Sequence, residues 1–194
     1  MIKDNTLDIM IFDNSDWAGE KLVLSWITGG KLYQLFHGVE HYKGFSSWKE
    51  TFEWINQLEP HRKINSIQYW GHGSSGAVWM NDTALNSQSV KEDSDLFSHL
   101  QNLCTRLEPT SLVWFRTCNT FAGELGHKFA KTFSNFLGCT VAAHTYVIGP
   151  WQSGLHTIKP DMEPSWPVEE GLTWSKPWTK NTIFCLTGKI PPNW

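Results

Sequence analysis

The chain has 194 residues with a formal net charge of −3; 40 % are hydrophobic and only 18 % are charged. This length fits a single domain spanning 1–194, and the apolar content excludes a disordered chain. The acidic balance argues against a nucleic-acid-binding protein, and the sequence has no apolar run long enough to predict a membrane span. Asp4 stands where a signal peptide needs an apolar stretch, so we expect a cytoplasmic protein. The four cysteines stand singly, which favours free thiols over a disulfide framework or a zinc finger.

Hydrophobic patterning predicts alternating strands and helices along the first three quarters of the chain. Continuous apolar runs predict strands at 7–12, 64–70, 111–117 and 140–148. Apolar residues at helical spacing predict helices at 48–57, at 93–107 and from 121 to the stop signal at Gly138. Residues 22–30 fit a strand or a short helix, and 77–80 fit a hairpin arm. Near-continuous apolar strands separated by helices are typical of a three-layer α/β sandwich, with a mostly parallel sheet and helices on both faces.

Two of the predicted strands end in reactive side chains. The strand at 64–70 leads into His72, which is flanked by glycines, and the strand at 111–117 leads into Cys118. The carboxyl ends of parallel strands meet at one edge of a sheet, so we expect His72 and Cys118 to be neighbours. An imidazole beside a thiol can act as the base for a cysteine nucleophile, and the helix starting near residue 121 would favour the thiolate. The N–H groups of Gly73 and Cys118 could bind an oxyanion.

The two motifs, YWGHG at 69–73 and FRTC at 115–118, resemble those of the caspase-like cysteine peptidases. That group includes caspases, metacaspases, clostripain, gingipains, separase and the CHAT proteases. The resemblance covers 7–148 and implies a caspase-hemoglobinase fold, a catalytic dyad of His72 and Cys118, and an oxyanion hole formed by the amides of Gly73 and Cys118. Asn-Thr after Cys118 replaces the Arg-Gly of caspases, which points to a divergent, bacterial-type member.

Arg116 bears on substrate choice. In metacaspases, the residue two before the cysteine is acidic and lines the pocket for a basic P1 side chain. Arg116 at the corresponding place predicts, by charge complementarity, a preference for an acidic P1 residue. The alternative is that Arg116 pairs with a structural acid such as Glu124 or Glu163.

The pattern of strands and helices stops after residue 148. We expect 149–194 to be a Trp- and Pro-rich loop extension with one late strand at 183–186. Five of the 12 tryptophans lie there, namely Trp151, Trp166, Trp174, Trp178 and Trp194. They either cover one edge of the sheet or shape apolar subsites of a substrate cleft. For Trp151 and Gln152, which follow the strand after the nucleophile's helix, we expect substrate binding.

The sequence thus predicts a cysteine endopeptidase that acts on a protein or peptide through an acyl-enzyme, with no metal or organic cofactor and with regulation by a protein partner or a loop. The alternative is a catalytically inactive caspase-fold module that binds partners through its Trp-rich C-terminal surface. A metal site formed by His72, Cys118 and His144 is disfavoured, because no short ligand spacing supports it. We expect His144 to be a core histidine and His127 to be solvated.

Overall fold

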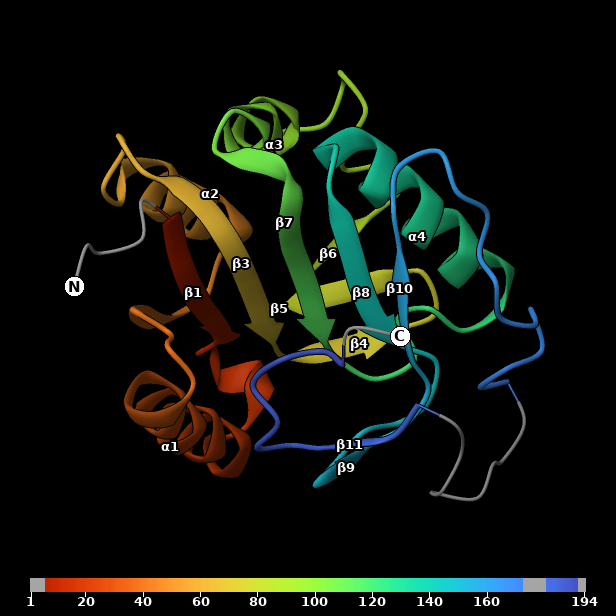
Figure 1. The fold of residues 1–194 in the computed structure, drawn as a ribbon, viewed down its shortest axis with the longest axis horizontal. Coiled ribbons are helices and arrows are strands. Elements are labelled where there is room, and N and C mark those ends of the chain that lie inside the picture. The colour runs from red at the N-terminus through yellow and green to blue at the C-terminus, as the bar shows by residue number, and fades with distance from the viewer. Residues whose placement is uncertain (1–5, 173–180, 192–194) are drawn as a thin grey trace.

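The computed structural model describes residues 6–172 and 181–191, and its centre is a six-stranded sheet in the order β10-β8-β7-β3-β1-β2 (Figure 1). The strands are β1 (Thr6–Asp13), β2 (His41–Phe45), β3 (Lys63–Trp70), β7 (Leu107–Arg116), β8 (Thr140–His144) and β10 (Leu155–Ile158). Five of them are parallel, and β10 runs antiparallel to β8 at one edge. This arrangement confirms the mostly parallel sheet. The two edge strands, β2 and β10, were not expected from the sequence.

One face of the sheet is covered by three helices (Figure 1). They are α2 (Trp48–Gln57), α3 (Phe97–Cys104) and α4 (Gly123–Leu137). Their apolar sides form the main core with alternate residues of the strands; the Phe115 ring, for example, packs edge-on against Phe129 at 5.4 Å between centroids. The helix expected at 93–107 is shorter in the structure, because β7 already begins at Leu107. Gly138, with φ +66°, ends α4 as expected.

The opposite face is covered by one helix and one extended segment. Helix α1 (Glu20–Phe36) packs over β1 and β3, whereas residues 181–191 cross β7 and β8. Both faces of the sheet therefore carry helices, as expected, and the extended segment covers the part of the second face that α1 leaves open. The structure resolves the ambiguity at 22–30 in favour of a helix. Its Gly30 lies against Tyr42, where a Cβ would come within 2.5 Å of the ring.

Two small sheets flank the carboxyl end of the large one. Strands β4 (His72–Ser74), β5 (Ala77–Met80) and β6 (Thr83–Asn86) form an antiparallel arm, which confirms the hairpin. Strands β9 (Trp151–Gln152) and β11 (Ile183–Phe184) pair on the side of the extended segment, which confirms a late strand. None of the helices in the described part of the chain is long and apolar enough to cross a membrane.

Candidate functional site

His72 and Cys118 line the same cavity, which has a volume of about 610 Å³ and lies at the carboxyl ends of β3 and β7. Their meeting follows from the register of the sheet. Trp70 pairs directly with Arg116 across these parallel strands, and each reactive residue follows two positions after the end of its strand. The remaining walls come from α1, from residues 148–152 and from the extended segment at Cys185. The structure therefore brings together the two residues that the sequence singled out.

The backbones of the two loops are in direct contact at Gly73. A Cβ at this position would lie 2.5 Å from the Cys118 carbonyl oxygen and 2.6 Å from the Thr120 hydroxyl. The Gly76 N–H also donates to the Thr120 carbonyl at 3.0 Å. Only glycine allows this approach, because any side chain would push the two loops apart.

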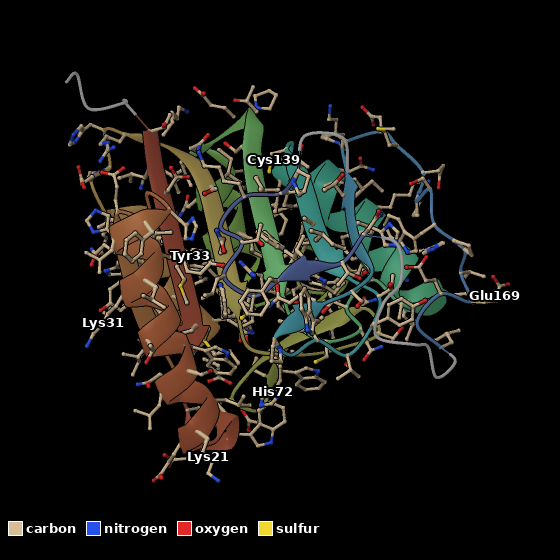
Figure 2. All side chains as sticks on the ribbon, turned by 60° about the horizontal axis from the view of Figure 1, so that its bottom comes forward. Lys21, Lys31, Tyr33, His72, Cys139 and Glu169 are labelled. Atoms are coloured by element: carbon tan, nitrogen blue, oxygen red, sulfur yellow. The ribbon has the colours of Figure 1, made fainter. Side chains whose placement is uncertain are left out.

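The His72 ring is oriented by a backbone carbonyl. Its Nε2 lies 3.4 Å from the carbonyl oxygen of Ala18, which ends a short 3-10 turn before α1. Since a carbonyl can only accept, this contact favours the tautomer in which Nε2 carries the proton and Nδ1 is free to accept one. Trp17 and Trp26 pack edge-on against the ring, with centroids at 5.0 and 6.2 Å. Figure 2 places His72 at the periphery of the molecule. Nothing in the sequence indicates this role of Ala18, because the contact is made by a backbone atom.

Cys118 is a half-buried free thiol. Its Sγ accepts a hydrogen bond from the Ile148 N–H at 3.4 Å. Burial raises the pKa of the Cys118 thiol, and the Ile148 hydrogen bond offsets this only in part. Desolvation thus opposes the thiolate in the resting protein, and the expectation that α4 favours the thiolate stays a prediction. Among the described residues, the hydrogen bonds of the His72 and Cys118 side chains go to backbone groups and none joins the two.

The turn after Cys118 is fixed by Asn119, which has a left-handed backbone with φ +56°. Its N–H donates to the Tyr146 carbonyl at 3.1 Å, and its side-chain amide donates to the Thr145 carbonyl at 2.9 Å. Asparagine tolerates this conformation better than most residues. The nucleophile loop is thus tied to the chain that leaves β8.

Arg116 lies beneath the cavity and is only 2 % exposed. Its guanidinium donates to the side-chain oxygen of Gln152 at 2.7 and 3.0 Å, to the Tyr33 hydroxyl at 2.6 Å and to the Cys185 carbonyl at 2.8 Å. It is sandwiched by Trp70 and Trp114, whose ring centroids lie 4.3 and 4.2 Å away. Burial lowers the pKa of Arg116 to about 10, which leaves it cationic at neutral pH.

The structure contradicts the alternative in which Arg116 pairs with an acid. Glu163 instead pairs with Lys131, Glu124 is exposed on α4, and within the described residues no carboxylate contacts the guanidinium. All five of its N–H groups are matched by neutral acceptors. The cation is thus fully hydrogen-bonded but not neutralised.

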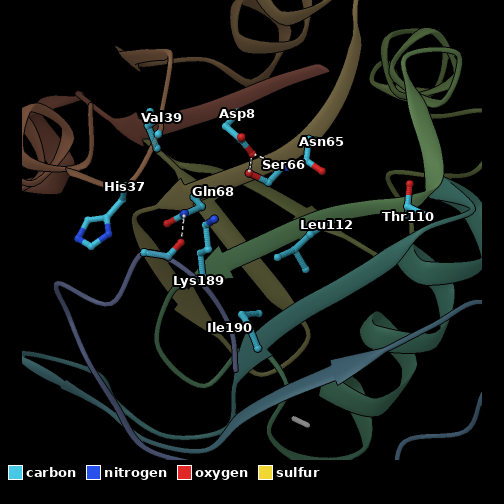
Figure 3. A pocket seen from close by; sticks show the side chains of 12 residues that line it. Asp8, His37, Val39, Asn65, Ser66, Gln68, Thr110, Leu112, Lys189 and Ile190 are labelled. Carbon is cyan, nitrogen blue, oxygen red and sulfur yellow. Dashed lines mark hydrogen bonds between the residues drawn. The ribbon is translucent and has the colours of Figure 1, made fainter. Parts of the chain in front are cut away.

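A second cavity of about 340 Å³ lies on the same sheet face, on the other side of this hydrogen-bond network (Figure 3). Gln68 lines this second cavity and also belongs to the hydrogen-bond network. Its side-chain oxygen accepts from Arg116 at 3.2 Å, and its amide donates to the Gly188 carbonyl at 3.1 Å. The segment 185–190 is thereby pinned between the two cavities.

The tryptophans of the C-terminal extension have separate places. Gln152 is buried and lines the site cavity, whereas Trp151 is 44 % exposed, stacks edge-on against Phe184 and does not line it. Successive side chains of a strand point to opposite sides, so only one of the two can face the cavity. Trp166 is buried against Phe121, with parallel rings 5.0 Å apart, and covers the sheet edge instead of shaping a subsite. Trp174, Trp178 and Trp194 lie outside the described residues.

The remaining histidines do not belong to the site. His144 is buried. Its Nε2 accepts a hydrogen bond from the Trp114 indole N–H at 3.4 Å, and its Nδ1 donates to the Ser153 carbonyl oxygen at 3.1 Å. Burial lowers the pKa of His144 to about 3, so it is a neutral core histidine as expected. Both of its nitrogens are used, which removes the metal site with His72 and Cys118; the described ranges hold no group of three or more His, Cys, Asp or Glu suited to a metal ion. The expectation that His127 is solvated is wrong, because its ring packs edge-on against the Trp166 ring, with 5.2 Å between centroids.

All four cysteines are free thiols, as expected.

No curated protein matches the sequence. A family model described as a domain of unknown function, DUF4347, matches residues 43–156, which is more than half of the chain and includes both His72 and Cys118. The chain therefore belongs to the DUF4347 family.

Proposed function

We propose that this protein is a caspase-like cysteine endopeptidase with a caspase-hemoglobinase fold, acting in the cytoplasm on a protein or peptide substrate. The observation that carries the proposal is the convergence of His72 and Cys118 on one cavity, with Gly73 packed against the Cys118 carbonyl. Two loops from neighbouring strand ends are held so closely that their reactive side chains share a space where a peptide bond could lie.

The proposed reaction follows from the protonation states. Nδ1 of His72 accepts the Cys118 thiol proton, and the thiolate attacks the peptide carbonyl carbon. The N–H groups of Gly73 and Cys118 donate to the resulting oxyanion. Protonated His72 then gives its proton to the leaving amine, and a thioester remains. Water, deprotonated by His72, hydrolyses the thioester and regenerates the thiol. The separation of the two side chains in the free protein is compatible with this, since catalytic hydrogen bonds often tighten only when substrate binds.

The uncompensated charge of Arg116 supports an acidic P1 residue. Because its N–H groups are already used, the arginine acts as a buried positive charge behind Gln152, not as a bidentate clamp. At roughly 6 Å and an effective dielectric constant of about 20, a carboxylate in the cavity would gain about 3 kcal/mol of attraction. A lysine or arginine at P1 would be repelled by a similar amount.

An electrophilic peptide probe with mass-spectrometric mapping tests the catalytic proposal. We expect selective labelling of Cys118 that is lost in His72→Ala and kept in His61→Ala, a histidine on the surface. Cys185 also lines the cavity, so Cys185→Ala is the matched control and should keep the labelling. Equal labelling of all four cysteines would instead favour the inactive binding module.

A P1-varied fluorogenic peptide library tests the specificity. We expect faster cleavage after Asp or Glu than after Lys or Arg. The opposite order would show that the charge of Arg116 does not select the substrate.

A further inference from the structure

An aromatic platform lies beside His72, outside the cavity. Trp17 belongs to the 3-10 turn before α1, and Trp79 lies on β5 directly opposite His72 in the β4–β5 pairing. The centroid of the Trp17 ring is 5.0 Å from that of His72 and 6.2 Å from that of Trp79. Neither tryptophan lines the cavity that contains Cys118. The imidazole thus has the nucleophile's cavity on one side and the two indoles on another.

This platform is not core material. Trp17 is 53 % exposed, although tryptophan is the side chain that gains most from burial. The indole N–H of Trp79 donates to the Ser74 hydroxyl at 3.0 Å, so its polar group is satisfied and its ring surface remains for apolar contact. Trp79 is half-buried, and tryptophan is among the residues enriched at binding hot spots.

The mechanism proposed above, on which this inference rests, defines what would meet the platform. The acyl half of the substrate stays at Cys118, in the cavity above Arg116 and Gln152. The amine half leaves after it has received a proton from His72. The first residue of the leaving half, P1′, therefore lies on the side of His72 that faces away from the cavity, where Trp17 and Trp79 stand.

We propose that Trp17 and Trp79 form the P1′ subsite and select an aromatic residue there. Indole rings bind aromatic side chains by offset or edge-on stacking. They also attract cations, but His72 is positively charged from the moment it takes the Cys118 proton until it passes that proton to the leaving amine, and during this time it repels a lysine or arginine at P1′. An aromatic platform alone would accept both aromatic and cationic side chains, and the charge of His72 disfavours the cationic ones.

The test uses two internally quenched peptides with the same acidic P1 residue, one with Phe and one with Gly at P1′. For the wild-type protein we expect kcat/KM to be about 10-fold higher for the Phe peptide, which corresponds to about 1.4 kcal/mol. Trp17→Ala should reduce this ratio to about 1, and Trp17→Phe should largely keep it. The ratio compares two peptides on the same variant. A lower fraction of folded protein or a displaced His72 side chain therefore changes both rates alike and cancels.

Trp151→Ala is the matched control, because it removes a tryptophan of similar exposure away from the platform and should leave the ratio unchanged. Equal cleavage of both peptides by the wild-type protein, or a ratio that survives Trp17→Ala, would overturn the subsite but not the peptidase. Cleavage of neither peptide, without labelling of Cys118 by the probe, would overturn the peptidase and the subsite with it.

Discussion

Replacing Gly73 by alanine tests whether contact between the two loops builds the site. The added Cβ would meet the Cys118 carbonyl at 2.5 Å and the Thr120 hydroxyl at 2.6 Å, both far inside van der Waals contact. Neither atom can move freely, because the Thr120 hydroxyl is hydrogen-bonded to that of Thr117 at 2.6 Å and the Cys118 carbonyl belongs to the backbone. Overpacking of this kind costs about 1–3 kcal/mol, while the lower chain entropy of unfolded alanine returns about 0.4–1 kcal/mol.

We therefore expect Gly73→Ala to lower the free energy of unfolding by about 1–2 kcal/mol, measured by urea denaturation, and the melting temperature by about 2–8 °C. The matched control is Gly149→Ala at the cavity mouth, where a Cβ would meet no atom within 4 Å. Peptidase activity should fall by about 100-fold in Gly73→Ala, since the oxyanion donors move with the loops, and should persist in Gly149→Ala. Wild-type stability and activity in Gly73→Ala would refute the claim that the loops need this contact.

Three further predictions concern buried groups around the site. Tyr33→Phe removes an acceptor from the Arg116 guanidinium and should lower the free energy of unfolding in urea by about 2 kcal/mol. The control is Tyr42→Phe, because the Tyr42 hydroxyl has no partner among the described residues; it should lower that free energy by under about 0.5 kcal/mol. Equal losses in the two variants would contradict this prediction. The pKa of His144 falls from 6.5 to about 3 on folding, so the unfolded chain alone takes up this proton as the pH drops from 6.5 towards 3. Stability at pH 5 should be about 2 kcal/mol below that at pH 7 through this group, and His144→Gln should remove that difference; parallel pH profiles would refute it. Burial raises the pKa of Cys118, so its alkylation by iodoacetamide in the free protein should rise only above the ordinary thiol value of 9.0; half-maximal labelling below pH 8 would reveal a preformed thiolate.

The convergence of His72 and Cys118 was predictable because it depends on local patterns. An apolar strand followed by a glycine-flanked His, and another followed by Cys, needed only the rule that parallel strands end at a common edge. The register that pairs Trp70 with Arg116 then sets the two residues level. Both steps use neighbours in sequence or in the sheet, which hydrophobic runs indicate well.

The groups that orient these residues were not predictable, because they come from distant segments through backbone atoms. The Ala18 carbonyl and the Ile148 N–H carry no side-chain signal in the sequence. Helix α1 was ambiguous because Gly29 and Gly30 look like a break, yet Gly30 is the small residue that lets the Tyr42 ring approach the helix. The letters of a glycine pair do not tell whether it lies in a turn or in a packed helix, because the residues that contact it in space decide this.

Arg116 explains why an extended segment can replace a second helix on the face above β7 and β8. A helix satisfies its own carbonyls, whereas the segment 185–187 presents free ones, and a buried guanidinium needs acceptors in several directions. The carbonyls of Cys185 and Thr187 supply two of them, at 2.8 and 3.0 Å. Removing the arginine would leave these carbonyls only the Tyr33 hydroxyl as a donor, and removing the segment would leave a buried cation short of acceptors. The C-terminal extension and the charge beneath the cavity are therefore parts of one structure, and the substrate would meet that charge only in a chain whose end is folded across the sheet.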